Sequence, residues 1–86
     1  MLIRTSSLFR RRFKKLPARI KDKVARQNIL FRVNAFDHRL GTHKLHGAKK
    51  DEWAWCIDYS YRVTFLFISD DEVLYTNVGT HNEVYR

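Results

Sequence analysis

The stretch Trp53–Phe67, with the sequence WAWCIDYSYRVTFLF, decides the fold, because apolar residues alternate with other residues on both sides of a short polar centre. A period of two is typical of β-strands that bury one face. The aromatic and β-branched apolar side chains occupy odd positions, among them Trp53, Trp55, Ile57, Val63, Phe65 and Phe67. The even positions hold a mixed set: Ala54, Cys56, Asp58, Arg62, Thr64 and Leu66. We therefore predict two paired strands with the odd positions facing the core and the even positions on an open face.

The turn between these strands must contain an odd number of residues. Directly opposed residues in an antiparallel pair share a face, so a two-residue turn would pair Ile57 with Arg62 and bury a charge. A three-residue turn over 59–61, or a bulge, pairs Ile57 with Val63 and Asp58 with Arg62. We predict this arrangement, which leaves Arg62 on the open face opposite Asp58.

Further strands flank this hairpin. We predict strands at about 39–46, 52–58, 61–68 and 72–79, with Asp70-Asp71 as the turn before the last one. The connections are too short for crossovers, so this part of the sheet should be an antiparallel meander. The apolar start Leu2–Thr5 reads as one more short strand.

The segment between the first strand and the meander has a helical pattern. Its apolar residues recur at spacings of three, four or seven and form one helix face: Phe9, Phe13, Leu16, Ile20, Val24 and Phe31. Pro17 suits the first turn of a helix but not its interior, so we predict two helices, at about 7–15 and 17–33. The fold class is α+β: an N-terminal strand, a helical hairpin and then an antiparallel β-meander, in a single domain over 1–86.

Size and composition restrict the class of protein. A chain of 86 residues buries only about 60–65% of its unfolded surface, so its core must use few, large side chains. Cys56 is the one cysteine and cannot form an internal disulfide, and no apolar run is long enough to span a membrane. We expect a soluble cytoplasmic protein with no membrane partner.

The charge is concentrated in the first part of the chain. Residues 1–50 carry fifteen Lys and Arg against two acids, a net charge of +13, whereas residues 51–86 carry two against seven, a net charge of −5. A basic half of this kind indicates a polyanionic partner, usually nucleic acid, or an acidic protein. A solvated basic surface that only aids solubility is the alternative.

Seven polar residues are expected on or beside the open face: His43, Lys44, His46, Asp58, Arg62, His81 and Tyr85. His43 and His46 lie three apart on a predicted strand and so point to opposite faces, which argues against a shared metal ion. The sequence has no Cys/His metal spacing and no glycine-rich phosphate loop. We expect no metal and no cofactor.

This set of residues suits cleavage of RNA by its own 2′-hydroxyl group. The reaction needs a base for the 2′ proton, cations around the crowded phosphorane, and an acid for the departing 5′ oxygen. Histidines such as His43 and His81 can be acid or base near neutral pH. Arg62 offers several donors to a phosphate, Lys44 and His46 offer further positive charge, and Tyr85 can stack on a base or donate to the phosphate.

Each of these residues also has a purely structural interpretation. Arg62 fits a role as the ion-pair partner of Asp58 alone. His43 and Lys44 fit an ordinary basic surface, and His46 fits a solvated turn. The C-terminal histidine and tyrosine fit a plain turn packed on the sheet.

Short motifs along nearly the whole chain resemble the RelE/ParE superfamily of bacterial toxins, and their order is most similar to the RelE/YafQ-like branch. The motifs are Phe9 with Lys15-Leu16-Pro17, Asn34-Ala35-Phe36-Asp37-His38-Arg39-Leu40, His43-Lys44-Leu45-His46-Gly47, Trp53 with Ile57, Tyr61-Arg62-Val63-Thr64-Phe65, and Gly79-Thr80-His81-Asn82-Glu83-Val84-Tyr85. The chain departs from the YafQ pattern in the middle strand, where Cys56 and Ser60 stand in place of a histidine and an aspartate. Ala35 replaces a proline that is usual in the loop motif.

The resemblance implies roles for individual residues. His43 and Lys44 match the family's basic residues on the second strand, and Arg62 matches an arginine that contacts the phosphate. His81 matches the C-terminal catalytic histidine of the YafQ and YoeB type. Tyr85 matches the terminal aromatic residue that stacks or aids catalysis.

The resemblance also implies an activity and partners. RelE-like members are toxins of type II toxin–antitoxin systems that cleave mRNA in the A site of the 30S ribosomal subunit without a metal. The basic face would then contact ribosomal RNA, and an acidic antitoxin segment that folds on binding would block the site. Two alternatives are a ParE-like gyrase inhibitor without catalysis and an inactive member that only binds nucleic acid or antitoxin.

Overall fold

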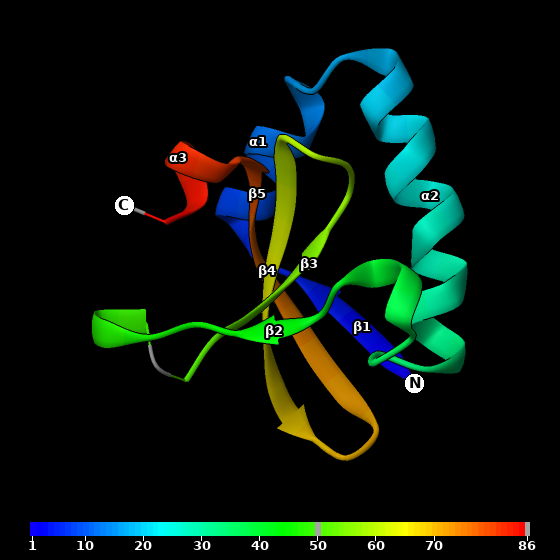
Figure 1. Cartoon of the computed structure of the whole chain (residues 1–86), viewed down its shortest axis with the longest axis vertical. Coiled ribbons are helices and arrows are strands. Elements are labelled where there is room, and N and C mark those ends of the chain that lie inside the picture. Colours follow the sequence, from blue (N-terminus) through cyan, green and yellow to red (C-terminus); the bar gives the residue numbers. More distant parts are fainter. Residues whose placement is uncertain (50, 86) are drawn as a thin grey trace.

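The computed structural model describes residues 1–49 and 51–85 and contains a five-stranded sheet with helices on both sides (Figure 1). The sheet has the order β1-β5-β4-β3-β2. Its strands are β1 (Leu2–Thr5), β2 (His43–Lys44), β3 (Trp53–Cys56), β4 (Tyr61–Ser69) and β5 (Glu72–Thr80). The helices are α1 (Ser7–Lys14), α2 (Ala18–Val33) and α3 (His81–Val84), with 3₁₀ turns η1 (His38–Leu40) and η2 (Gly47–Lys49). The predicted α+β class, with strand, helical hairpin and meander in that order, is confirmed.

Residues at the N-terminal ends of α1 and α2 determine where these helices begin. Ser6 caps α1 by accepting a hydrogen bond from the backbone N–H of Phe9, at 3.0 Å. Pro17 lies immediately before α2, as its lack of an N–H favours. The predicted helical ranges 7–15 and 17–33 therefore agree with the structure to within one residue.

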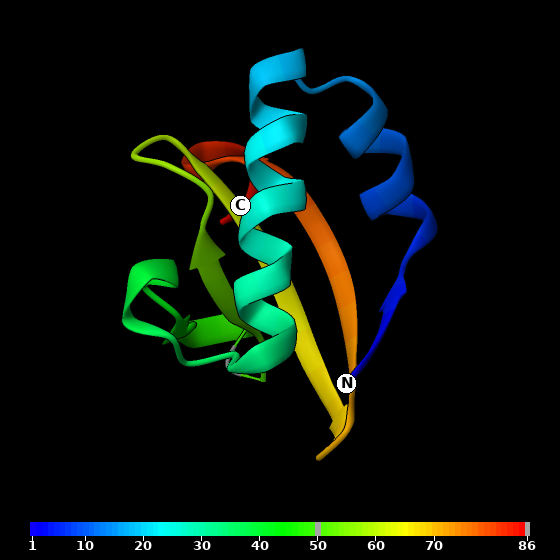
Figure 2. The same ribbon diagram turned by 90° about the vertical axis from the view of Figure 1, so that its right-hand side faces the viewer.

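Helix α2 crosses one face of the sheet and buries an aromatic core there (Figure 2). Phe31 is fully buried, with its ring centroid 4.9 Å from that of Phe65, 5.5 Å from Tyr75 and 6.2 Å from Trp55. The burial of odd positions in the hairpin is confirmed for Trp55, Ile57, Val63 and Phe65. The prediction that the even positions lie on an open face is wrong in part, because Ala54 and Thr64 are also fully buried. Phe67 shares this face but lies beyond the helices, where 37% of its surface is exposed.

The turn between β3 and β4 has three residues, as the parity of the pattern requires, but it lies at 58–60. The N–H of Ile57 donates to the carbonyl of Tyr61 at 2.9 Å, and Cys56 lies opposite Arg62. The predicted pairing of Asp58 with Arg62 is wrong by two residues. The cause is local, because Oδ1 of Asp58 accepts the N–H groups of Ser60 and Tyr61 at 2.8 and 2.9 Å and so starts the turn at 58.

The predicted strand at 39–46 is also wrong in its extent, because β2 contains only His43 and Lys44. Asp37 caps η1 by accepting from the N–H of Arg39, which keeps the chain helical up to Leu40. Gly41 follows with φ of 61°, a left-handed conformation that breaks the strand. A Cβ at Gly41 would lie 3.2 Å from Sγ of Cys56, so a side chain would also make a tight contact there.

The first strand joins the sheet in parallel with β5, with Leu2 opposite Glu72 and Thr5 opposite Tyr75. The other three strand pairs are antiparallel. In the part of the chain that the structure describes, no helix combines the length and the apolar character needed to cross a membrane.

Candidate functional site

A short C-terminal helix, α3, folds over the end of the sheet and places two of the predicted site residues. Its N-terminus is a capping box in which Thr80 and Glu83 each bind the other's backbone N–H. Val84 is fully buried and fixes the helix on the sheet. A Cβ at Gly79 beneath it would lie 2.9 Å from Oε1 of Glu83, so a side chain there would displace the Glu83 carboxylate from the capping box. Since Gly79 pairs with Arg62, α3 and Arg62 lie at the same end of the sheet.

His43 reaches this end of the sheet from β2, where it pairs with Ala54 of β3 and so projects from the open face. Its Nδ1 lies 3.0 Å from the carbonyl oxygen of Gly41, and its Nε2 lies 2.9 Å from the hydroxyl of Tyr85. A carbonyl oxygen can only accept, so Nδ1 carries the proton. In the neutral ring Nε2 is then the acceptor, and the hydroxyl of Tyr85 donates to it.

Tyr85 stands between two histidines. Its ring packs edge-on against His81, with centroids 4.4 Å apart and planes at 86°, while the centroid of His43 lies 6.3 Å away. Burial raises the pKa of the Tyr85 phenol, and the positive charge of Arg62 partly opposes this effect. The phenol therefore stays protonated near neutral pH and can donate a hydrogen bond.

Arg62 lies over the turn 58–60. Its Nη1 donates to the carbonyl oxygens of Asp58, Tyr59 and Tyr61 at 2.7, 3.1 and 3.0 Å. The alternative role of Arg62 as the ion-pair partner of Asp58 is not seen, because the carboxylate of Asp58 caps the turn and lies 3.6 Å from Nη1 of Arg19. The fixed guanidinium helps to line an open hollow of about 420 Å³ whose other walls are Tyr59, Ser60, His81 and Asn82.

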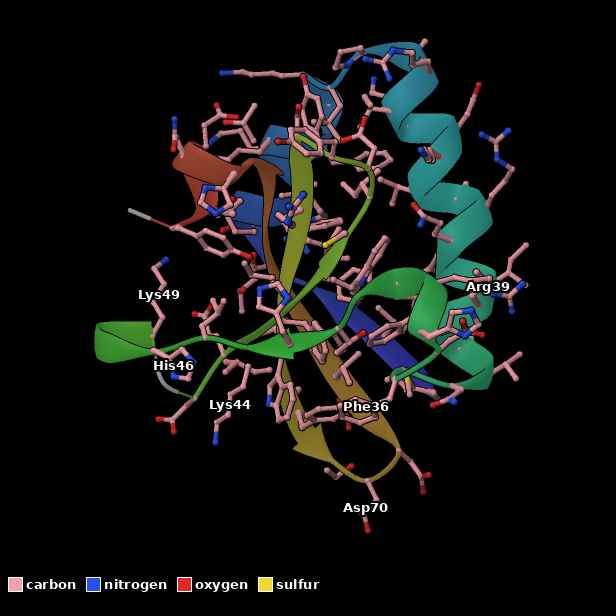
Figure 3. The ribbon with its side chains drawn as sticks, in the orientation of Figure 1. Phe36, Arg39, Lys44, His46, Lys49 and Asp70 are labelled. Carbon is pink, nitrogen blue, oxygen red and sulfur yellow. The ribbon has the colours of Figure 1, made fainter. Side chains whose placement is uncertain are left out.

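The structure thus brings together four of the seven predicted residues, His43, Arg62, His81 and Tyr85. Asp58 caps the turn at 58–60, and Lys44 and His46 lie elsewhere. Lys44 pairs with Trp53 and lies on the face of the sheet that α2 covers, with Nζ 5.8 Å from the centroid of the Trp53 ring. Figure 3 shows Lys44 extending from β2 on the side away from α3. His46 is exposed beyond the end of β2.

Several positioning residues were not predicted. Lys49 donates from Nζ to the carbonyl oxygen of Val84 at 3.1 Å and so satisfies the C-terminal end of α3. Gly41 orients His43 through its carbonyl group. The capping box was readable as Thr80-x-x-Glu83, whereas the contact of Lys49 joins residues 35 apart, whose proximity no local pattern indicates.

Replacing Thr80 with alanine is expected to lower the free energy of unfolding by about 1 kcal/mol, since the N-cap side chain satisfies an end N–H group of α3. Thr80→Ser keeps the hydroxyl and is the matched control, with an expected change within about 0.5 kcal/mol. Urea unfolding of both variants measures the difference. Equal losses would show that the threonine methyl group, and not the cap, is what matters.

Acidification is expected to loosen α3 through Glu83. The pKa of this carboxyl is lowered by the backbone N–H of Thr80, which donates to it at 2.8 Å, and by the Thr80 side chain. Because the folded-state pKa lies below the unfolded one, the stabilisation is present above the unfolded pKa and is lost as pH falls through the folded pKa. An NMR titration of the Thr80 amide should follow this loss, and Glu83→Gln should remove it. An amide signal that titrates identically in the Gln variant contradicts the assignment.

Comparison with solved structures shows that the fold is that of known toxins. YafQ from E. coli strain BL21(DE3) superposes with a TM-score of 0.82 at 16% sequence identity, covering 98% of this chain and 97% of YafQ. A YoeB/ParE toxin from Agrobacterium tumefaciens gives 0.78 at 14% identity, covering 94% and 99%. The RelB–RelE antitoxin–toxin complex from Methanococcus jannaschii contains a chain that gives 0.74 at 14% identity, covering 95% and 94%. No family model and no curated protein matches the sequence. The fold expected from the resemblance to RelE/ParE toxins is confirmed.

Proposed function

We propose that this protein is the toxin of a type II toxin–antitoxin system and cleaves mRNA in the ribosomal A site. The observation that carries the proposal is the contact of Tyr85 with both His43 and His81, beside the hollow that Arg62 and His81 line. Two groups able to transfer protons and one fixed cation meet at one end of the sheet. The structural neighbours, which are toxins, support the same role.

The chemistry is attack of the 2′-oxygen on the neighbouring phosphorus, with loss of the 5′-oxygen of the next nucleotide. His81 stands in the hollow and exchanges a proton with one of these oxygens. His43 is the second proton-transfer group; its Nε2 accepts from the hydroxyl of Tyr85, whose ring packs against His81 of the hollow. No metal ion enters any of these steps.

Arg62 is proposed to hold the reacting phosphate. Its hydrogen bonds to the turn all use Nη1 and bind backbone carbonyl groups. Nε and Nη2 keep their donors for the phosphate oxygens, where charge accumulates in the phosphorane. The carbonyl contacts pre-position the guanidinium, so little ordering is needed when RNA binds.

The basic surface is proposed to bind ribosomal RNA. The exposed sides of α1 and α2 carry most of the positive charge, and phosphate contacts of this kind position a protein without reading sequence. Lys44 and His46 belong to this wider surface, away from the hollow, and would contact phosphates remote from the reaction. An acidic antitoxin is the proposed protein partner; two of the neighbours were solved in toxin–antitoxin complexes.

Addition of the purified protein to translating ribosomes tests the proposal. We expect cuts in the mRNA at the A site, mapped by primer extension, and none in the same mRNA without ribosomes. A DNA-damage response in cells together with intact mRNA would favour a ParE-like gyrase inhibitor. No effect on growth without antitoxin would favour an inactive binding protein.

A further inference from the structure

A second pocket lies next to the hollow and includes none of the residues proposed above for proton transfer or phosphate binding. Its volume is about 300 Å³, and it is lined by Arg12, Lys15, Leu16, Pro17, Tyr61, Val78 and Glu83. The end of α1 and the start of α2 form one wall, and β4, β5 and α3 form the other. The pocket therefore lies where the helical hairpin meets the C-terminal helix.

The pocket and the hollow are neighbours along two segments of the chain. Tyr61 lines the pocket and Arg62 lines the hollow; Glu83 lines the pocket and Asn82 lines the hollow. Successive strand residues point to opposite faces, so the two sites lie on either side of the same sheet end. A ligand bound in the hollow that continues past this end reaches the pocket next.

The charge of the pocket suits one phosphodiester group. Arg12 and Lys15 supply two positive charges, and Nη1 of Arg12 is held by Oδ1 of Asn77 at 3.2 Å. The Glu83 carboxylate supplies one negative charge, but it is occupied by the backbone N–H of Thr80. The balance of one positive charge matches the single negative charge of a nucleic-acid phosphate.

The remaining walls are apolar or aromatic. Exposed Pro17 offers hydrocarbon surface above the buried Leu16 and Val78, and the half-buried ring of Tyr61 offers a face on which a base can stack. A cationic rim above such a floor has the character of a nucleotide site. An acidic peptide would bind the cations, but its carboxylates would gain nothing from the aromatic ring and the proline.

We propose that this pocket binds the nucleotide next to the scissile phosphate in a single-stranded RNA. The inference rests on the proposed function, because it takes the hollow as the place of cleavage. Arg12 and Lys15 bind the phosphate of that nucleotide, and Tyr61 contacts its base or ribose. The pocket fixes the strand so that the phosphate in the hollow lies beside His81 and Arg62.

The test is the affinity of the full chain for a short single-stranded RNA with 2′-O-methyl groups, which cannot be cleaved. The double variant Arg12→Ala/Lys15→Ala is expected to raise Kd about tenfold and to lower the slope of log K against log salt by about 1.4, or about 0.7 for each lost contact. The matched control, Arg11→Ala/Lys14→Ala, removes the same charge from the same helix outside the pocket. It is expected to raise Kd by less than about threefold. Equal losses in the two variants would overturn the proposal.

Two further comparisons keep the result interpretable. If circular dichroism shows that the double variant is unfolded, two single variants at exposed positions replace it. Lys15→Glu is then compared with Lys14→Glu, and the same difference in Kd is expected. A glutamate decapeptide is the probe for an acidic protein partner. Peptide binding that depends on the pocket, with RNA binding that does not, would overturn the nucleotide assignment.

Failure of the pocket and failure of the proposed function give different results. Normal A-site cleavage and normal RNA affinity in the double variant would disprove the nucleotide-binding role of the pocket and leave the proposed function intact. If the wild-type protein does not cleave mRNA but binds RNA in a pocket-dependent way, the proposed function is disproved and the nucleotide-binding pocket is supported.

Discussion

Replacing His81 with alanine is expected to slow mRNA cleavage on translating ribosomes by about 100- to 10,000-fold, the usual contribution of a positioned acid or base. The side chain is exposed in the hollow, and the backbone N–H of residue 81 keeps its bond to the carbonyl of Ser60. The free energy of unfolding should therefore change by less than about 0.5 kcal/mol. Single-turnover cleavage of ribosome-bound mRNA measures the rate.

Asn82→Ala is the matched control for this experiment. Asn82 follows His81 on α3, is also exposed and lines the same hollow, but it cannot act as an acid or base at neutral pH. We expect its cleavage rate to stay within a few fold of the wild type. A His81→Ala protein that cleaves as fast as Asn82→Ala contradicts the assignment of proton transfer to His81.

Replacing Phe31 with alanine is expected to lower the free energy of unfolding by about 3–5 kcal/mol, because a fully buried ring is lost and a cavity remains. The ring contacts Trp55, Phe65 and Tyr75, which come from three different strands. A loss of this size is a large part of the total stability of a small domain. Urea unfolding followed by tryptophan fluorescence measures it.

Ile29→Ala is the control on the same helix. Ile29 is 65% exposed, so its replacement removes an apolar side chain without opening a cavity. We expect a change of less than about 0.5 kcal/mol. If Phe31→Ala were no more destabilising than Ile29→Ala, the aromatic cluster would not be the main source of stability.

The sequence predicted those features that depend on periodicity. The odd positions of the hairpin had to share a buried face, and Trp55, Val63 and Phe65 do so. The exact register was not predictable from parity, because three-residue turns at 58–60 and 59–61 keep the same faces. The carboxylate of Asp58 determines that the turn lies at 58–60, because it accepts hydrogen bonds from the backbone N–H groups two and three residues later.

The candidate site was predicted only in part for a related reason. His43 and Tyr85 are 42 residues apart, and their contact depends on how far β2 extends and where α3 folds back. Lys44 follows His43 in β2 and therefore points to the other face, and the end of β2 at Lys44 leaves His46 outside the strand. Side-chain chemistry could be read from the residue types, but proximity came from tertiary structure.

The parallel pairing of β1 with β5 has a consequence for biosynthesis. Residues 2–5 are made well before their strand partner, residues 72–75, leaves the ribosomal exit tunnel. Pairing over so long a separation is slow, and the sheet cannot close before the partner has emerged. His81 and Tyr85 emerge later still. If the protein acts on ribosomes as proposed, a nascent chain is harmless to the ribosome that makes it until its final strand is free to fold.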